Sequence, residues 1–531
     1  MTTAPAPVTP EASPQVVIVG AGPTGLLLAG ELERRDVSCL LIDALDAPQS
    51  WDRATVVHPR SMEIFEALGL ADRFLDQGVK VRAARFRSDG ETLGERDHGL
   101  ADSRYGFDLG VSEEVTESVL TANLERHGGG VTRSTRLVGL RPRPDGIAAT
   151  LERNGERREV LTSWVVGCDG FHSAARELTG IEFPGTDVKA PWAVFDATLE
   201  GWDEEFDVNA AYLDSPPVIL TPLPGRRWRV YLRPTSDTSD LVADAAEVIH
   251  RYKPEVTFAA VENPARFHCH SRVAARFRSG RVLLAGDAAH VCSPAEGHGM
   301  NTGLQDAFNL GWKLAPVCKG VSGPALLDSY EAERRPVALR VVESGEAVEG
   351  GQAMTAKDDR AARDAVIRET YADPESAHHE AVAAAELDRS YADCGAVMGD
   401  TGNGVAPGYR LPDTLPVHPA AGEPCALHEL THRPDHTLLV LGGREAAPAD
   451  VLDLVTALEA AHAGSPVVGA VLGLCTRMAG PPIGRIDESV ADQVGIEHVT
   501  LLAVRPDRFV GFRHNGQDPR ALQPYLEALT R

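Results

Sequence analysis

The hydrophobic pattern near the N-terminus predicts a strand, a helix and a second strand. Residues 15–19 (QVVIV) form a short apolar run rich in β-branched residues, which is typical of a buried strand. A glycine-rich break at 20–25 follows, and residues 26–35 then show helical periodicity. The next apolar run, SCLLI at 38–42, predicts a second buried strand that ends at Asp43. Together these elements predict a βαβ unit.

The pattern changes further along the chain. Strand-like pieces separated by proline and glycine turns fill residues 185–275, which predicts an antiparallel sheet inserted into an α/β domain. Residues 281–290 return to a buried strand, and a glycine-rich loop and a helix at 301–315 follow. The segment 326–395 is rich in Ala, Glu, Asp and Arg and predicts long helices.

A glycine- and proline-rich boundary at 402–416 precedes a last unit, in which apolar runs alternate with an Ala-rich helix. This order predicts a small C-terminal α/β domain. We therefore expect a disordered lead-in, an α/β domain in two parts, an inserted sheet and a C-terminal domain. The corresponding ranges are 1–14, then 15–184 with 276–400, then 185–275, and finally 401–531.

Charge narrows the choice of partners. The 531 residues include 52 Lys and Arg against 77 Asp and Glu, which gives a net charge of −25. A surface this acidic repels phosphate backbones and anionic membranes. The N-terminus has no basic and apolar signal pattern, and no apolar stretch reaches the roughly 18 residues of a membrane span. We expect a cytoplasmic protein without nucleic acid or membrane partners, and leave open whether it forms a homo-oligomer.

The cysteine and histidine pattern does not indicate a metal centre. No two of the eight cysteines stand three residues apart, so there is no CxxC pair. His268 and His270 flank Cys269 at alternate positions of a strand, but no fourth ligand follows at a usable spacing. We therefore predict no metal site, structural histidines and reduced thiols, with Cys292 a packed thiol.

The segment GAGPTG at 20–25 has the spacing of a dinucleotide-binding turn. Gly20 permits the tight turn, Gly22 lets backbone N–H groups approach a pyrophosphate, and Gly25 lets the helix pack on the strand. Asp43, 18 residues after Gly25, is placed to accept hydrogen bonds from a ribose. The turn alone does not separate FAD from NAD, and a glycine-rich turn without a ligand is the alternative. The binding residues expected in this turn are Gly20, Gly22, Pro23, Thr24 and Gly25.

Three further segments carry longer motifs: RVLLAGDAAHVCSPAEGHGMNTGLQDAFNLGWKLA at 281–315, WVVGCDGFHSAARELTGIEFPG at 164–185 and RATVVHPRSMEIFEALGL at 53–70. They resemble the FAD-dependent aromatic hydroxylases, single-component flavoprotein monooxygenases that include phenol hydroxylases, chlorophenol monooxygenases and polyketide hydroxylases. RPDRFVGFR at 505–513 resembles the end of the thioredoxin-like domain in the phenol hydroxylase branch. The implied fold is a Rossmann-like FAD-binding α/β domain with an inserted antiparallel-sheet substrate domain and a thioredoxin-like C-terminal domain.

The resemblance implies how the second motif would contact FAD. Asp287 would hydrogen-bond the ribityl chain. A helix N-terminus at the pyrimidine edge of the flavin would stabilise negative charge near N1 and O2. The loop that passes the isoalloxazine and the backbone N–H groups that face it come from Pro294, Gly297, Gly299, Met300 and Asn301.

Four other positions follow from the resemblance. Asp169 matches a residue that contacts both FAD and the nicotinamide cofactor, and Arg53 matches a flavin-contacting arginine. Glu113 stands where family members often carry Gln, and Glu296 stands where Gly is common. These two departures bear on the local geometry around the cofactor.

The implied reaction is hydroxylation of a phenolic or heteroaromatic ring, in a natural-product intermediate or a phenol. FAD, NADPH or NADH, and O2 would act through a C4a-hydroperoxyflavin. Tyr212 and Thr55 are the candidate substrate-orienting residues. The weaker candidates are His58, Trp192 and Tyr231.

Other functions remain open on the same sequence. Epoxidation or Baeyer–Villiger oxygen insertion would use the same scaffold, and a flavin-loaded protein that sequesters an aromatic ligand would need little turnover. A plain NAD dehydrogenase would use the first turn only. A flavin halogenase is disfavoured because its WxWxIP signature is absent and no lysine follows GAGPTG where that group needs one.

Overall fold

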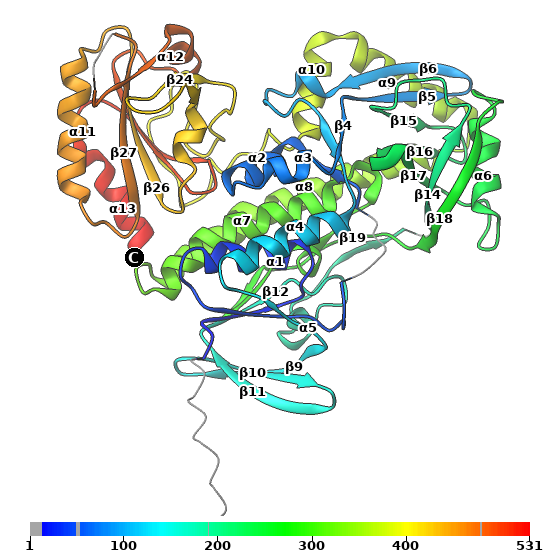
Figure 1. Cartoon of the computed structure of the whole chain (residues 1–531), viewed down its shortest axis with the longest axis horizontal. Helices are drawn as coiled ribbons and strands as arrows, with labels where there is room; N and C mark the ends of the chain where they lie inside the picture. Colours follow the sequence, from blue (N-terminus) through cyan, green and yellow to red (C-terminus); the bar gives the residue numbers. More distant parts are fainter. Residues whose placement is uncertain (1–12, 49–53, 189–190, 478–480) are drawn as a thin grey trace, which may run out of the picture.

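The protein is described by a computed structural model that covers residues 13–48, 54–188, 191–477 and 481–531. Arg53 and residues 1–12 of the expected lead-in lie outside the described residues. Helices α1, α4, α7 and α8 lie together at the centre (Figure 1), with a parallel sheet below them, a second sheet at the upper right and the C-terminal unit at the upper left.

A mainly parallel six-stranded sheet carries the predicted βαβ unit, which the structure confirms. β1 (Val16–Val19) is parallel to β2 (Cys39–Ile42) and to β12 (Trp164–Gly167), and its four apolar residues are all buried. α1 (Pro23–Glu33) joins β1 to β2 and packs against α4 (Glu113–Arg126) and α7 (His298–Cys318). The sheet order is β20 (Arg278–Ser279), β21 (Val282–Leu284), β12, β1, β2 and β8 (Val131–Thr132).

A seven-stranded sheet packs against α6 (Leu241–Ile249) around a core that includes Phe195 and Trp228. It extends beyond the segment 185–275, because the hairpin of β5 (Ala83–Ser88) and β6 (Glu91–Asp97) joins it along β15. Asp89 and Gly90 form the hairpin turn with φ values of 48° and 85°, as an Asp–Gly turn requires. The order is β18 (Thr257–Phe267), β14 (Trp192–Glu200), β17 (Arg227–Leu232), β16 (Val218–Leu223), β15 (Val208–Tyr212), β5 and β6.

Small three-stranded sheets and further helices complete the first 400 residues. The sheets are β9 (Thr135–Arg143), β10 (Gly146–Arg153) and β11 (Glu156–Thr162); β13 (Gly185–Asp187), β19 (His270–Val273) and β22 (His290–Val291); and β3 (Val56–Val57), β7 (Asp108–Gly110) and β4 (Val79–Val81). The helices are α2 (Pro59–Ala67), α3 (Ala71–Leu75), α5 (Ala174–Leu178), α8 (Asp328–Gln352), α9 (Lys357–Ala372) and α10 (Pro374–Ala384).

The C-terminal unit is built on a mixed eight-stranded sheet with apolar clusters around Val440 and Leu439, neighbours that point to opposite faces. Its helices are α11 (Pro448–His462), α12 (Glu488–Val494) and α13 (Gln523–Thr530). The strand order is β23 (Met398–Gly399), β30 (Val510–Asn515), β29 (Val499–Val504), β26 (His436–Gly442), β27 (Val468–Cys475), β28 (Gly484–Ile486), β24 (Pro416–His418) and β25 (Cys425–Ala426).

A buried ion network joins this unit to the central helices. Arg505, just after β29, donates two hydrogen bonds to the Glu333 carboxylate on α8, at 2.8 and 2.7 Å. Lys313 on α7 donates to the same carboxylate at 2.6 Å. Asp507 accepts from Arg505 and from the Trp312 indole, so each charge in the network has a partner.

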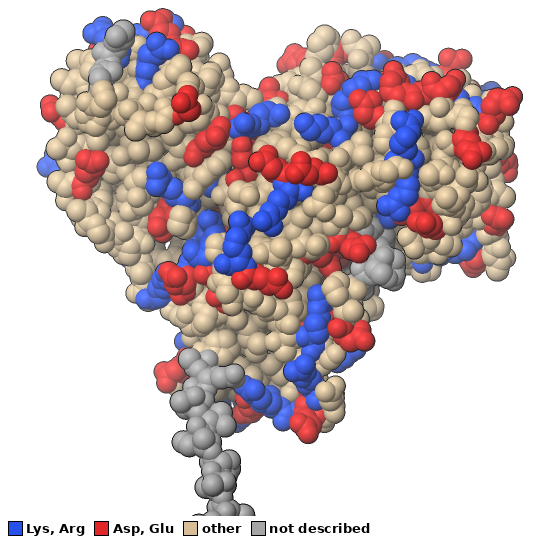
Figure 2. All heavy atoms as spheres, viewed as in Figure 1, with Lys and Arg blue, Asp and Glu red and all other residues tan. Residues whose placement is uncertain are grey.

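The face shown in Figure 2 carries basic and acidic side chains interspersed over the whole outline, with no single large basic patch in that view. Within the described ranges, none of the helices combines the length and the apolar run that crossing a bilayer requires.

Candidate active site

A cavity of about 410 Å³ lies between the six-stranded sheet and the seven-stranded sheet. Loops after β1, β2, β12 and β21 form one side, and strands β15, β16 and β17 form the other. Of the predicted cofactor and substrate residues, those that line it are Gly22, Pro23, Thr24, Asp43, Thr55, Glu113, Asp287, Pro294, Gly297, Gly299 and Met300. Predicted residues that are described but do not line it are Gly20, Gly25, Asp169, Tyr212 and Asn301.

The glycines of the dinucleotide turn have different physical reasons. Gly20 has φ +99°, and a Cβ there would lie 2.3 Å from the carbonyl oxygen of Cys168. A Cβ on Gly25 would lie 2.0 Å from the carbonyl oxygen of Gly20. Both are therefore required by the packing of the chain itself. A Cβ on Gly22 would meet only Glu117 Oε1 at 4.0 Å, so this glycine leaves room in the cavity for a ligand.

Asp43 closes the turn from the end of β2. Its Oδ2 accepts from the Ala21 N–H at 2.7 Å, and its Oδ1 accepts from the Leu45 N–H at 2.8 Å. These bonds hold the carboxylate at the cavity wall, where a ribose would bind.

The second predicted loop leads into the N-terminus of α7. Gly297 caps this helix with φ +72°, and no side chain hydrogen-bonds to the cap. The first-turn N–H groups on the cavity side are therefore not capped by a side chain. A Cβ on Gly299 would meet only Cys292 Sγ at 4.0 Å. A 21-residue helix concentrates partial positive charge at this end. Open glycines and an N-terminal dipole at both loops fit the pyrophosphate and the anionic flavin edge of FAD.

Asn301, in the first turn of α7, acts through its side chain, a role that the sequence motif did not indicate. The buried amide donates from Nδ2 to the carbonyl oxygens of Val56 and Gly297, at 3.0 and 2.9 Å. Its Oδ1 accepts from the backbone N–H of His58 at 2.9 Å. Asn301 therefore fastens the segment that carries Thr55 and His58 to the start of α7.

Asp169 also serves the local backbone. Its carboxylate accepts from Ser173 Oγ at 2.5 Å and from the Ala175 N–H at 3.1 Å, at the start of α5. Burial raises its pKa above the usual value despite these bonds. The next two residues, Gly170 and Phe171, line the cavity, so the motif reaches the site through its turn.

The sheet side of the cavity presents Tyr231 rather than Tyr212. Tyr231 lies opposite Ile219 on the next strand, and both line the cavity. The Tyr231 hydroxyl lies 2.9 Å from Thr55 Oγ1. Asn209 of β15 also lines the cavity, so Tyr212, three positions later, points to the other face. There it is fully buried, with the Arg87 guanidinium 5.4 Å from its ring centroid.

A histidine–aspartate–histidine cluster stands behind the flavin loop. His58 Nδ1 lies 2.9 Å from Asp108 Oδ1, and His58 Nε2 lies 3.1 Å from the carbonyl oxygen of Glu296. His98 Nε2 lies 3.4 Å from the second oxygen of Asp108. The structure adds Asp108, which lines the cavity, to the predicted set. It stands 50 residues from His58 in sequence, so no local spacing indicated the pair.

The pKa values of the two histidines in the cluster shift in opposite directions. Burial lowers the pKa of His58, but the Asp108 carboxylate outweighs it, so the net pKa is raised. Donation from both ring nitrogens suits the protonated form. Burial lowers the pKa of His98 to about 4. Burial also opposes ionisation of Asp108, yet the two histidines hold its pKa well below the usual value.

The other residues singled out in the sequence lie around the same cavity. Trp192, His268 and Cys269 line it, and so does His270, which stacks on Phe171 at 4.0 Å between ring centroids. His270 Nδ1 also lies 2.8 Å from Asp187 Oδ1. Burial raises the pKa of Cys292 far above its usual value, so this thiol stays protonated.

A dinucleotide turn and a second helix N-terminus face a separate sheet across one cavity, which is the arrangement of a protein that binds a dinucleotide cofactor. The sequence profile of a family described as "FAD binding domain" matches residues 13–345. The chain therefore belongs to this family of FAD-dependent aromatic monooxygenases, and FAD is the cofactor that the described residues fit.

Individual relatives agree. The chain is 38% identical over 347 residues to 6-methylpretetramide 4-monooxygenase of Streptomyces rimosus, an alignment that spans 63% of this chain and only 62% of that protein. It is 32% identical over 518 residues to 12-dehydrotetracycline 5-monooxygenase/anhydrotetracycline 6-monooxygenase of Streptomyces rimosus subsp. rimosus, covering 91% and 97% of the two chains. The ternary complex of aklavinone-11 hydroxylase with FAD and aklavinone is similar with a TM-score of 0.75 and 25% identity, over 98% of this chain and 99% of that one.

Proposed function

We propose that the protein is an FAD-dependent monooxygenase that hydroxylates the aromatic ring of a phenolic natural product, with NADPH or NADH as electron donor and O2 as co-substrate. One observation carries the proposal. The residues that fit FAD and the polar residues of the seven-stranded sheet line one continuous cavity. A ring bound on the sheet side would therefore lie beside the cofactor.

When bound, FAD supplies the redox chemistry, accepting electrons from the nicotinamide and activating dioxygen. Gly22 and the N-terminus of α1 would hold its pyrophosphate, with Asp43 at the ribose. Gly299 and the N-terminus of α7 would stabilise negative charge at the flavin edge. Asp287, which lines the cavity at an exposed position, is placed for the ribityl chain.

The chain's own task is to orient the ring and exclude water. Thr55 and Tyr231 offer two adjacent hydroxyls, which can accept from a phenol and donate back to its oxygen. Trp192 and Ile219 give this region apolar walls that keep water from the reacting atoms. His58, whose Nδ1 lies beside the Asp108 carboxylate, also lines the cavity and can hold a proton there.

We propose a fused polycyclic phenol as substrate. A relative aligned over 97% of its length is named as a monooxygenase of 12-dehydrotetracycline and anhydrotetracycline, and the similar hydroxylase structure is a ternary complex with FAD and aklavinone. Residues 185–275, together with the β5–β6 hairpin, would form the substrate domain. The rest of 15–184, together with 276–400, would form the FAD-binding domain.

The C-terminal unit, 401–531, is proposed to be thioredoxin-like. The order β30, β29, β26, β27 supports this, with β26 parallel to β27 across α11 and β29 antiparallel to both of its neighbours. The unit has no CxxC pair, so we assign it no redox role.

A turnover assay tests the function. The FAD-loaded protein is mixed with NADPH, ¹⁸O2 and a panel of polycyclic and simple phenols. We expect a substrate that accelerates NADPH loss and yields a product heavier by one labelled oxygen, placed on the ring by NMR. Tight binding without product would identify a sequestering protein instead, and a lactone or epoxide product would identify oxygen insertion of another kind.

A further inference from the structure

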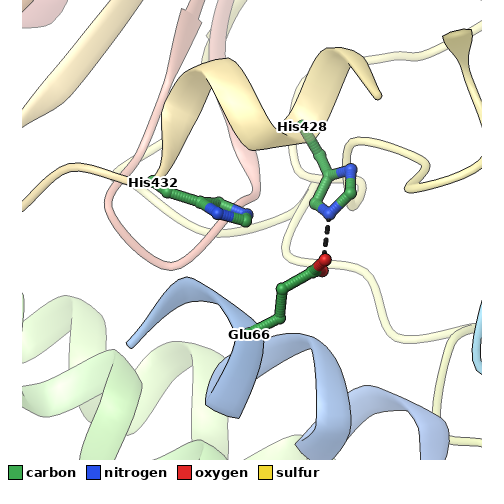
Figure 3. A group of neighbouring side chains, drawn as sticks. All are labelled: Glu66, His428 and His432. Atoms are coloured by element: carbon green, nitrogen blue, oxygen red, sulfur yellow. Dashed lines mark hydrogen bonds and ion pairs between the residues drawn. The ribbon is translucent and has the colours of Figure 1, made fainter. Parts of the chain in front are cut away.

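Glu66, His428 and His432 form a compact group of potential metal ligands outside the cavity. Glu66 lies on α2, and the two histidines belong to a short helical turn, η6 (Leu427–Thr431), and the residue after it. One ligand atom from each residue lies within 4.8 Å of the other two. Figure 3 shows both imidazole rings and the carboxylate turned toward the gap between α2 and the turn.

Two nitrogens of this group lack partners although they are buried. His428 is 2% exposed, and its Nδ1 has no hydrogen-bond partner. His432 Nε2 is likewise buried without one. Buried ring nitrogens ordinarily find partners, because an unmet one costs roughly as much as a lost hydrogen bond. His428 faces Glu66 through Nε2, so its Nδ1 lies on the other side of the ring, and the unpartnered His432 Nε2 is the nitrogen that points to a missing ligand.

The neighbouring side chains hold the ligands in place. His428 Nε2 lies 2.8 Å from Glu66 Oε2, and Arg104 donates to the other Glu66 oxygen at 2.8 Å. Thr431 Oγ1 donates to the carbonyl oxygen of His428 at 2.6 Å. In metal sites, hydrogen bonds from neighbouring groups of this kind orient the side chains that bind the metal. The side chain of Glu66 is 14% exposed, which leaves an entry path for an ion.

We propose that Glu66, His428 and His432 bind a divalent transition metal, with Zn²⁺ the ion that best suits two imidazoles and one carboxylate. Binding would replace the His428–Glu66 hydrogen bond with two metal bonds, and His428 would take the neutral tautomer that carries its proton on Nδ1 and binds the metal through Nε2. This departs from the expectation, drawn from sequence spacing, that the chain holds no metal.

The charges around the group balance one another. The guanidinium groups of Arg104 and Arg508 oppose a metal ion, while the carboxylates of Glu66 and Glu429 attract it. A moderate affinity follows from this balance.

The site is structural rather than hydrolytic. HELTH at 428–432 has the spacing of the zinc-peptidase motif, in which the glutamate acts as general base. Here Glu429 accepts from Arg104 at 2.7 Å and from the Ala426 N–H at 3.1 Å, so it is committed elsewhere. A metal in this place would join α2 of the FAD-binding part to the C-terminal unit.

Zinc content and thermal stability test the site in the full-length FAD-loaded protein. The protein is stripped with EDTA and dialysed first against Zn²⁺ and then against buffer, and its zinc content is measured by inductively coupled plasma mass spectrometry. Its melting temperature is recorded separately with Zn²⁺ and with EDTA. We expect one retained equivalent and a higher melting temperature with Zn²⁺. H432A should bind zinc at least about tenfold more weakly and lose the shift.

H378A is the matched control, because His378 also pairs with a carboxylate, Asp102, at 2.8 Å but has no third ligand. It should retain zinc like the wild type. E66Q, which keeps the shape of the side chain, repeats the test should H432A fold poorly. Absence of retained zinc in the wild type, or equal retention in H432A, E66Q and H378A, would overturn the site. FAD content and turnover are read separately, so failure here leaves the proposed function untouched.

Discussion

The Thr55 and Tyr231 hydroxyls lie 2.9 Å apart at the cavity wall, joining the loop before β3 to strand β17 of the seven-stranded sheet. The two residues are 176 positions apart in sequence. The pair therefore forms only when the loop before β3 is correctly docked on the seven-stranded sheet, and it presents two adjacent hydroxyl groups at the cavity wall.

Replacing Tyr231 by Phe should lower kcat/KM for a phenolic substrate by about tenfold, the worth of one substrate hydrogen bond of roughly 1.4 kcal/mol. A poorly held ring also reacts less efficiently, so the ratio of hydrogen peroxide to product should rise. Steady-state kinetics with peroxide and product quantified together provides the measurement.

Tyr212→Phe is the control for that variant. Tyr212 is a fully buried tyrosine of the same sheet whose side chain faces away from the cavity. The Tyr212→Phe variant should keep kcat/KM and the ratio of hydrogen peroxide to product near the wild-type values. Equal losses in the two variants would mean that the Tyr231 hydroxyl does not act on the substrate.

The dinucleotide turn yields a separate prediction. Gly22→Val should fold, because its φ of −76° suits any residue and a Cβ meets no atom closer than 4.0 Å. The new side chain would fill the space for the pyrophosphate, so FAD affinity should fall more than about tenfold. Flavin retained after ultrafiltration measures the loss, and the apoprotein's melting temperature should not change.

Gly25→Ala should behave in the opposite way, since its Cβ would overlap the Gly20 carbonyl oxygen at 2.0 Å. We expect a loss of at least about 2 kcal/mol in the unfolding free energy of the apoprotein. Wild-type FAD affinity in Gly22→Val would show that this glycine serves the chain and not the cofactor.

Local motifs carried the prediction of the cofactor side of the site. The turn at Gly20–Gly25 and the loop before α7 each depend on short spacings, so their positions followed from sequence. Which face of a strand borders the cavity did not follow from the sequence. Alternation places Asn209 and Tyr212 on opposite faces, but it does not say which face meets the cofactor.

Long-range contacts account for the rest. Asp108 reaches His58 only because β7 pairs with β3, and the β5–β6 hairpin joins a sheet formed mostly more than 100 residues later. The same limit hid Glu66, which is 362 residues from His428, although the HELTH spacing of His428 and His432 lies within one segment and could have indicated two of the three ligands. Sequence spacing detects ligands within one segment and is blind to those that two domains supply jointly.

The histidine cluster predicts opposite pH dependences for its two members. His58 has a folded pKa above its unfolded value near 6.5, so its contribution to stability is complete below about pH 6.5 and is lost as the pH rises through the folded pKa. The stability difference between wild type and His58→Asn should therefore shrink from pH 6 to pH 8.5. Urea unfolding across that range measures it.

His98→Asn should show the reverse slope. The folded pKa of His98 is about 4, so between about pH 4 and 6.5 only the unfolded state is protonated there. Wild type should gain stability relative to His98→Asn as the pH rises through this window. The same sign of slope in both variants would contradict the assigned protonation states.

The last prediction concerns the attachment of the C-terminal unit. Arg505→Met would remove the guanidinium that pairs with both buried carboxylates, Glu333 and Asp507, while Lys313 would still donate to Glu333. Breaking a buried ion network in this way costs about 3–5 kcal/mol, far more than an exposed pair. Arg520→Met is the surface control, because its pair with Asp518 is largely exposed. Unfolding monitored by tryptophan fluorescence should show a large decrease in the free energy of unfolding for Arg505→Met and no resolvable change for Arg520→Met. Similar small decreases in both variants would mean that the buried network contributes little to holding the C-terminal unit against α7 and α8.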